Sequence, residues 1–166
     1  MKKVRVTLSF ENAVSKKAFP LSKSHVVVLL NFLNTALCAE EEWSQTRELL
    51  GFEWRALGIH VCDDEKMREF YFQYKGTRRS TDVLSFASRD SVFGVELGYL
   101  GDIVVSMESV LRNAKRLRKT VSVECETVLL HSFLHLLGFE HVGVSRKKAK
   151  RMQSMQRHLL LLWKKN

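Results

Sequence analysis

Alternation of apolar and polar residues marks the first predicted elements of this chain. Residues 3–9 and 55–62 follow a period of two, which is the spacing of a strand with one buried face. Two shorter apolar stretches, residues 83–86 and 102–105, complete a set of four predicted strands. Each strand would place alternate side chains on opposite faces of a sheet.

Apolar residues spaced three and four apart predict five helices. Residues that can cap a helix N-terminus stand where these helices would begin, among them Ser22 or Ser24 and, further on, Ser106 or Ser109. The predicted helices cover residues 21–37, 63–76, a segment from 106 or 109 through the basic residues that precede 120, residues 121–137 and a segment from 145 onward.

Interspersed strands and helices define the fold class that we predict. It is α+β, with a small mixed four-stranded sheet packed against helices, and a length of 166 residues fits a single domain, residues 1–166. Residues 89–99, which include Gly94 and Gly98, form the predicted loop. The apolar run at residues 26–30 is too short to cross a bilayer, and we expect neither a membrane span nor a targeting segment.

Charge adds a candidate partner to this picture. The net charge is +9, and the excess gathers in two clusters, residues 112–119 and 146–151. Such clusters favour polyanions, nucleic acid above all. Two alternatives stay open, which are a solvated helix face for either cluster and an anionic membrane surface, although no strongly amphipathic membrane helix accompanies them.

Cysteine usage indicates the compartment. Cys38, Cys62 and Cys125 are odd in number, lie far apart and form no C-x-x-C pair. Neither a disulfide framework nor a cysteine zinc ribbon is therefore suggested, and we expect a reduced, cytoplasmic location.

Three histidines stand in the pattern H-x-x-x-H-x-x-G-x-x-H, as His131, His135 and His141, with Gly138 before the last of them. On a helix, His131 and His135 lie one turn apart on the same face. Gly138 can adopt backbone conformations that other residues avoid, so it can end the helix and turn His141 back toward the pair. Three neutral imidazoles that converge make a zinc site with an open fourth position, which is the catalytic kind.

The alternative is that these are ordinary helix histidines, as H-x-x-x-H pairs commonly are. Residues 121–137 are apolar on nearly every side, which is typical of a buried helix. Buried imidazoles need partners for both ring nitrogens, and a metal ion would satisfy one nitrogen on each ring. We therefore interpret the three as metal ligands, and we expect His25, His60 and His158 to be ordinary side chains.

Metalloproteases share this ligand spacing in the pattern H-E-x-x-H-x-x-G-x-x-H. They use the glutamate after the first histidine as general base. That position is Ser132 here, and Glu140 stands beside the third histidine instead. Peptide hydrolysis would lack its proton acceptor, so the sequence disfavours a peptidase.

Three segments together resemble the YbeY family of bacterial ribosomal-RNA maturation endoribonucleases. They are T-D-V-L-S-F at residues 81–86, L-G-D-I-V-V-S at residues 100–106 and the histidine segment at residues 131–141. The order and spacing of the segments both fit the family.

This resemblance implies a zincin-like α+β fold, a cytoplasmic protein and one zinc ion (Zn2+) held by His131, His135 and His141. It also implies a single-strand-specific, zinc-dependent endoribonuclease that acts in late small-subunit (16S) ribosomal RNA maturation and in ribosome quality control. The implied partners are RNA of the small ribosomal subunit and ribosomal or assembly proteins, with no membrane.

The chain departs from the family pattern at several positions. Lysine replaces arginine in Tyr74-Lys75-Gly76, which keeps the charge but loses the bidentate fork with which arginine grips phosphate. Ser132 stands in place of a glycine, and Glu140 in place of an aspartate. Positions after the third histidine that are often acidic hold basic residues and glutamines, such as Gln153 and Gln156.

The chemistry that we expect is metal-assisted hydrolysis of a phosphodiester bond. Lys75, or a neighbouring arginine, would offset charge that develops on the phosphorane. Ser85 would donate a hydrogen bond near the metal, unless its hydroxyl binds backbone instead. Asp82 and Asp102 would either accept hydrogen bonds from ligand histidines or cap turns and pair with surface lysines.

A non-catalytic ribosome assembly factor is the second hypothesis. Such a protein would bind RNA or a ribosomal protein through its basic surface and use zinc only to hold its fold. The lysine at position 75 and the missing general base leave this hypothesis open. It predicts RNA binding that falls steeply with salt and survives mutation of a ligand histidine.

Overall fold

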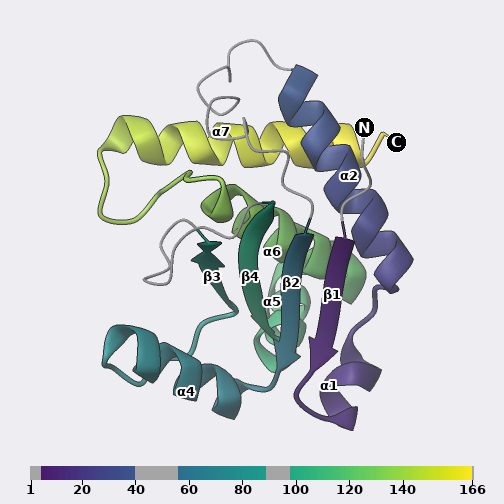
Figure 1. Ribbon diagram of the computed structural model, residues 1–166, viewed down its shortest axis with the longest axis vertical. Coiled ribbons are helices and arrows are strands. Elements are labelled where there is room, and N and C mark those ends of the chain that lie inside the picture. The colour runs from purple at the N-terminus through teal and green to yellow at the C-terminus, as the bar shows by residue number, and fades with distance from the viewer. Residues whose placement is uncertain (1–4, 40–55, 89–97, 166) are drawn as a thin grey trace.

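One mixed sheet of four strands organises the structure (Figure 1). The computed structural model describes residues 5–39, 56–88 and 98–165. β1, β2 and β4 run parallel, and β3 lies antiparallel to β4 at the end of the sheet order β1-β2-β4-β3. The strands are β1 (Arg5–Phe10), β2 (Ala56–Cys62), β3 (Val83–Ala87) and β4 (Tyr99–Ser106).

Helices begin where their capping side chains predict. Ser106 accepts a hydrogen bond from the Ser109 N–H, so Ser106 rather than Ser109 caps its helix. Ser22 accepts from the His25 N–H in the same way. The described helices are α1 (Ala13–Ala18), α2 (Lys23–Ala39), α4 (Asp64–Lys75), α5 (Met107–Leu117), α6 (Val121–Leu136) and α7 (Arg146–Trp163).

The two faces of the sheet are packed differently. On one face, Ile59 and Ile103 share a large apolar core with Phe133 of α6. On the opposite face, Val104 packs with Met67 of α4 in a second, smaller core. Figure 1 shows α5 and α6 behind the sheet, α4 below it and α7 across its upper end. The histidine helix therefore lies in the better-buried layer.

Gly101 on β4 allows β3 and the end of α6 to pack closely against β4. Its φ of +140° suits glycine, and a Cβ at this position would clash with the carbonyl oxygen of Phe86 and lie 3.1 Å from the Leu136 side chain. Without that Cβ, β3 and the last turn of α6 both approach β4 closely. The C-terminal end of α6 is thereby held against the sheet.

Asp64 fastens α4 to α5. Its Oδ1 accepts hydrogen bonds from the hydroxyls of Ser106 at 2.5 Å and Ser109 at 2.8 Å, and its Oδ2 lies 2.6 Å from the Arg112 guanidinium. The backbone N–H of Asp64 donates to the Glu108 carboxylate at 3.0 Å. Burial alone would raise the pKa of Asp64, but the hydrogen bonds from Ser106, Ser109 and Arg112 outweigh it, and the pKa lies below its ordinary value.

The α+β class and the mixed four-stranded sheet are confirmed. Helix α1 was not predicted, and the predicted strand positions 3, 4 and 55, the loop at residues 89–97 and the Cys38 side chain lie outside the described residues. A single domain over residues 1–166 stays a prediction. Within the described ranges, no helix combines the length and apolar character needed to cross a membrane.

Candidate metal centre

Helix α6 and the turn after it bring three histidines together. His131 and His135 lie one turn apart, and α6 ends at Leu136. Gly138 follows with a φ of +92°, and the N–H of Phe139 donates back to the Leu134 carbonyl at 3.0 Å. This closure of the helix end reverses the chain and returns His141 to the pair. The glycine signal predicted this turn.

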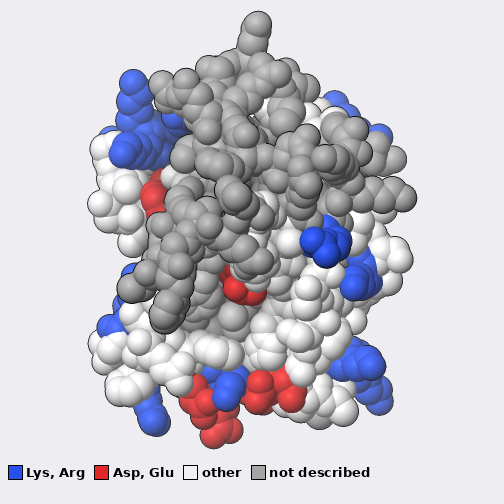
Figure 2. All heavy atoms as spheres, in the orientation of Figure 1, with Lys and Arg blue, Asp and Glu red and all other residues white. Residues whose placement is uncertain are grey.

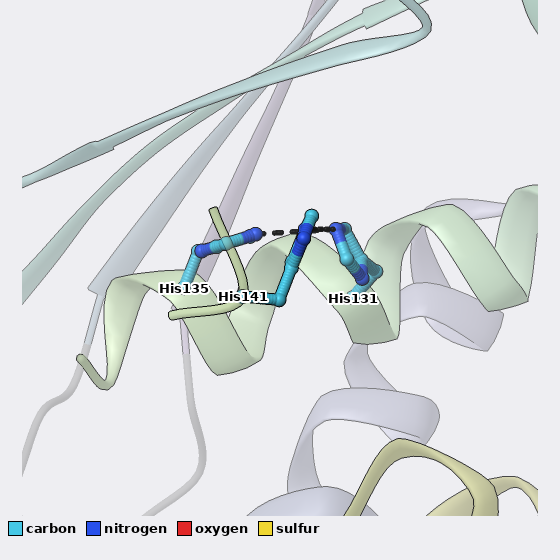
Figure 3. A group of neighbouring side chains, drawn as sticks. All are labelled: His131, His135 and His141. Carbon is cyan, nitrogen blue, oxygen red and sulfur yellow. Dashed lines mark hydrogen bonds between the residues drawn. The ribbon is translucent and has the colours of Figure 1, made fainter. Parts of the chain in front are cut away.

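The three rings aim the same atom at one point (Figure 3). The Nε2 of His131 lies 3.1 Å from the Nε2 of His135 and 3.2 Å from that of His141. Nitrogens bound to tetrahedral zinc at 2.0–2.1 Å are about 3.3 Å apart. The spacing therefore fits three ligands of one such ion. Among the described residues, this is the one group of three or more His, Cys, Asp or Glu side chains close enough to hold a metal.

The protein keeps these imidazoles ready to donate lone pairs. Burial lowers the pKa of His135 to about 4; proximity to His131 and His141 acts in the same direction, and a hydrogen bond to the Phe139 carbonyl opposes it. Burial also lowers the pKa of His141, as does proximity to His131. Both rings are therefore neutral near pH 7, as metal binding requires.

The second nitrogen of two rings has a protein partner. The Nδ1 of His131 lies 2.9 Å from the Oε1 of Gln156 on α7, and the Nδ1 of His135 lies 3.4 Å from the Glu140 carboxylate. Sequence reasoning did not assign this role to Gln156. A signal was present, because Gln156 is a polar residue four positions after the buried Met152 in the apolar stripe of α7.

Asp82 and Asp102 do not orient the ligand histidines, and that alternative is wrong. Asp82 accepts a hydrogen bond from the side-chain amide of Asn113 at 3.2 Å. Asp102 accepts one from the Tyr99 hydroxyl at 2.5 Å. Both carboxylates are engaged elsewhere, Asp102 among residues that face α4.

Of the two predicted catalytic side chains, the structure brings Ser85 to α6. The Ser85 hydroxyl donates to the carbonyl of Ser132, the residue after His131, at 3.4 Å. This is the backbone contact named as the alternative for Ser85. It nevertheless places the hydroxyl on the sheet face that carries α6.

Lys75 lies on the other side of the sheet. Its ammonium sits 4.4 Å from the centre of the Tyr74 ring, and that ring packs edge-on against Phe86 at 5.0 Å. Phe86 follows Ser85 on β3, so the two side chains point to opposite faces. The structure therefore separates Lys75 from the three histidines.

Ser132 gives no substitute for a metalloprotease glutamate. Its side chain is fully buried, and its hydroxyl donates to the Val128 carbonyl one turn earlier at 2.9 Å. The position that would carry a general base thus points into the core. This geometry agrees with the sequence in disfavouring a peptidase.

The two basic clusters differ in how far they are used internally. In the cluster at residues 112–119, Arg112 pairs with Asp64 and Lys119 pairs with Glu124 at 3.1 Å. In the cluster at residues 146–151, the side chains of residues 146–148 and 150 are exposed, with no ion pair to any described residue. Figure 2 shows Lys and Arg gathered over the first turns of α7. These cations follow His141 directly along the chain.

Comparison with known proteins finds a family that matches most of the chain. The family described as Endoribonuclease YbeY matches residues 13–164.

The chain belongs to this family.

Named members of the YbeY family align over much of their length. Endoribonuclease YbeY of Aquifex aeolicus is 29% identical over 135 residues, which cover 80% of this chain and 89% of that protein. The protein of the same name from Thermodesulfovibrio yellowstonii is 35% identical over 104 residues, covering 63% of this chain and 64% of that one. A third, from Sinorhizobium medicae, is 32% identical over 117 residues, covering 70% and 68%.

The YbeY match spans the elements that build the candidate metal centre. Residues 13–164 include α6, the turn to His141, Ser85 and the Gln156 contact from α7. The resemblance identified from three short segments is confirmed at the level of the family.

Proposed function

We propose that this protein is a zinc-dependent endoribonuclease that cleaves single-stranded RNA. The observation that carries the proposal is the convergence of three histidine Nε2 atoms at a spacing suited to zinc, in a chain of the endoribonuclease YbeY family. The finer role that we propose is late 16S ribosomal RNA maturation and ribosome quality control in the cytoplasm. The partners would be small-subunit RNA and ribosomal or assembly proteins.

His131, His135 and His141 would hold the ion in this proposal and leave its fourth position open. A bound zinc ion supplies a Lewis acid for a phosphoryl oxygen and lowers the pKa of water to about 7. Ser85 lies on the same sheet face, and its hydroxyl would have to leave the Ser132 carbonyl to donate its one proton to a phosphate oxygen.

Cations away from the histidines would bind the RNA backbone. The exposed basic residues at 146–148 and 150 lie on the helix that follows His141 and can contact phosphates on one side of the cleavage site. Lys75 enters the proposal as a phosphate contact further along the RNA, because it lies on the opposite face of the sheet from the metal centre. In this arrangement Lys75 would contribute to RNA binding and not to the charge at the reacting phosphate.

The non-catalytic assembly factor shares the metal centre and the basic helix and differs only in having no chemistry. It is therefore distinguished by activity. The exposed cations of α7 support RNA binding under either hypothesis.

The test is cleavage of an end-labelled single-stranded RNA by the purified full-length protein loaded with zinc. A duplex of the same sequence tests strand specificity, and His135→Ala, with its fold checked by circular dichroism, tests the metal centre. We expect the wild type to cut the single strand and the folded variant to bind RNA without cutting. Equal cleavage by both proteins would refute the proposal, and binding without cleavage by both would favour the assembly factor.

A further inference from the structure

Gln156 reaches the metal centre from a separate helix. Its Oε1 lies 2.9 Å from the Nδ1 of His131, 25 residues earlier in the chain. Met155 and Leu159, its neighbours on α7, are buried, so the helix is anchored in the core on both sides of the contact. The half-buried Gln156 side chain is thereby held over α6.

The direction of this hydrogen bond decides what His131 can do. The structure turns the carboxamide oxygen of Gln156 toward the ring, and with this oxygen as acceptor the His131 ring donates its proton from Nδ1. Its Nε2 then carries a lone pair, which faces the Nε2 atoms of His135 and His141. The other neutral tautomer would aim an N–H at the same point and repel a cation. Contact with the Gln156 oxygen thus selects the tautomer that can ligate a metal.

His131 depends on Gln156 more than His135 depends on any one residue. His135 has two acceptors within its own turn, the Phe139 carbonyl and the Glu140 carboxylate, whose side chain is 49% exposed. For the Nδ1 of His131, Gln156 is the acceptor that the described residues provide. The orientation of one ligand therefore relies on the docking of α7.

We propose that Gln156 is a positioning residue of the metal centre, which fixes the tautomer and the orientation of His131. As a neutral acceptor, Gln156 makes His131 a weaker electron donor than a carboxylate partner would. The inference rests on the proposed function only in requiring that the three histidines bind a metal. It does not require that the protein cleaves RNA.

The experiment measures zinc affinity of the full-length protein by competition with a chromophoric chelator. Gln156→Met removes the acceptor at nearly constant side-chain size, and Gln156→Glu replaces the amide by a carboxylate. Gln153→Met is the matched control, because Gln153 is an exposed glutamine on the same helix. The Nδ1 proton of His131, observed by NMR in the zinc-loaded protein, reports the hydrogen bond directly.

We expect Gln156→Met to weaken zinc binding by about 10- to 100-fold and to lose the hydrogen-bonded Nδ1 resonance. Gln156→Glu should bind zinc at least as tightly as the wild type, and Gln153→Met should match the wild type. A folded Gln156→Met protein with unchanged zinc affinity would overturn the inference. If that variant does not fold, a Gln156→Glu protein that binds zinc more weakly than the wild type would overturn it instead.

The outcomes separate this inference from the proposed function. A wild type that binds zinc in a Gln156-dependent way but cuts no RNA supports the inference and refutes the endoribonuclease. If the protein cleaves RNA and its zinc affinity does not depend on Gln156, the proposed endoribonuclease is supported and the inference about Gln156 is refuted. A wild type that binds no zinc overturns both.

Discussion

The histidine centre and the Asp64 centre are both polar clusters within this fold, yet they are built on opposite plans. At Asp64, one carboxylate accepts hydrogen bonds from two hydroxyls and pairs with a guanidinium, so the protein satisfies both of its oxygens. At the histidine centre, the Nε2 of His131 lies 3.1 Å from that of His135 and 3.2 Å from that of His141, so three ring nitrogens converge on one point. The protein itself satisfies the Asp64 carboxylate, whereas the histidine nitrogens converge on a point where a cation would bind.

This difference separates a structural polar group from a binding site. A buried charge is tolerated where its partners complete its hydrogen bonds, and the lowered pKa of Asp64 records that completion. Half-buried neutral bases that converge on one point gain from a cation bound between them. The presence of buried ionisable groups is therefore less informative than the balance of donors and acceptors around them.

Removal of one ligand should break the histidine centre with the largest effect. His141→Ala is expected to weaken zinc binding by more than about 100-fold and to abolish RNA cleavage, because two imidazoles cannot enclose the ion. The free energy of unfolding of the metal-free protein should change little. The measurements are calorimetric zinc titration and chemical denaturation with a chelator present.

His60→Ala is the control for that variant. His60 lies on the sheet face that carries α4, where it contacts Ser9 and Glu11. Zinc affinity should be unchanged. A His141→Ala protein with wild-type zinc affinity would contradict the assignment of this ligand.

Removal of the central acceptor at Asp64 should lower the stability of the protein and leave zinc affinity unchanged. Asp64→Ala leaves the Ser106 and Ser109 hydroxyls without their acceptor, and we expect a loss of about 2 to 3 kcal/mol in the free energy of unfolding. The Arg112 side chain is 59% exposed and can turn to water, which keeps the loss below that of a fully buried pair.

Denaturation by urea, with Glu69→Ala as an exposed control on the same helix, measures this loss. Zinc affinity should be the same in both variants and the wild type. A larger effect of Asp64→Ala on zinc affinity than on stability would mean that the two centres are coupled.

Acid should distinguish the two centres by the pH at which each loses stability. The pKa of His135 is lowered to about 4 in the folded, metal-free protein. Its contribution to the free energy of unfolding is therefore full above the unfolded pKa of about 6.5, and it is lost as the pH falls toward 4. The pKa of Asp64 is also lowered, so its contribution is full above its unfolded value of about 3.9 and is lost only at lower pH.

We expect the free energy of unfolding to fall by on the order of 2 kcal/mol between pH 6.5 and pH 4. Thermal denaturation of the metal-free protein across this range measures it. His135→Ala should flatten the fall, and Asp64→Asn should leave it intact. A fall that Asp64→Asn removes would reverse the assignment of the two windows.

The smallest expected effect belongs to Lys75, which neither centre includes. Lys75→Gln should weaken binding of single-stranded RNA by roughly fivefold at low salt and reduce the salt dependence by about one ionic contact. The rate of cleavage at saturating RNA should not change, because the ammonium lies beyond the sheet from the histidines. Single-turnover kinetics measure both quantities, and a collapse of the saturated rate would place Lys75 in the chemistry after all.

The parts of the structure that could be predicted from sequence are those encoded within one or two helical turns. The histidine pattern contains its own geometry, because the spacing of His131 and His135 and the glycine before His141 fix their meeting locally. Helix caps such as Ser106 are likewise local, because the capping side chain binds the backbone N–H three residues later. Helix α1 escaped because six residues are too few to show a period.

The parts that could not be predicted depend on contacts between distant segments. Gln156 meets His131 across 25 residues, and Asp64 meets Ser109 across 45. No local pattern specifies these pairs, since they follow from how α7 and α4 dock. Ser85 and Lys75 lie on opposite faces of the sheet because α6 packs on the face of Ser85 and α4 on the face of the next strand residue, Phe86.

The turn at Gly138 has a consequence for the order in which the molecule assembles. His131 and His141 enclose a span of only 11 residues, so little chain entropy is lost in bringing the three rings together. Helix α6 with its closing turn can therefore bring the three rings together early, whereas the Gln156 contact and the Asp64 cluster must wait for segments far apart in the chain to dock. When the full chain refolds, the three rings would thus meet before the Gln156 and Asp64 contacts form.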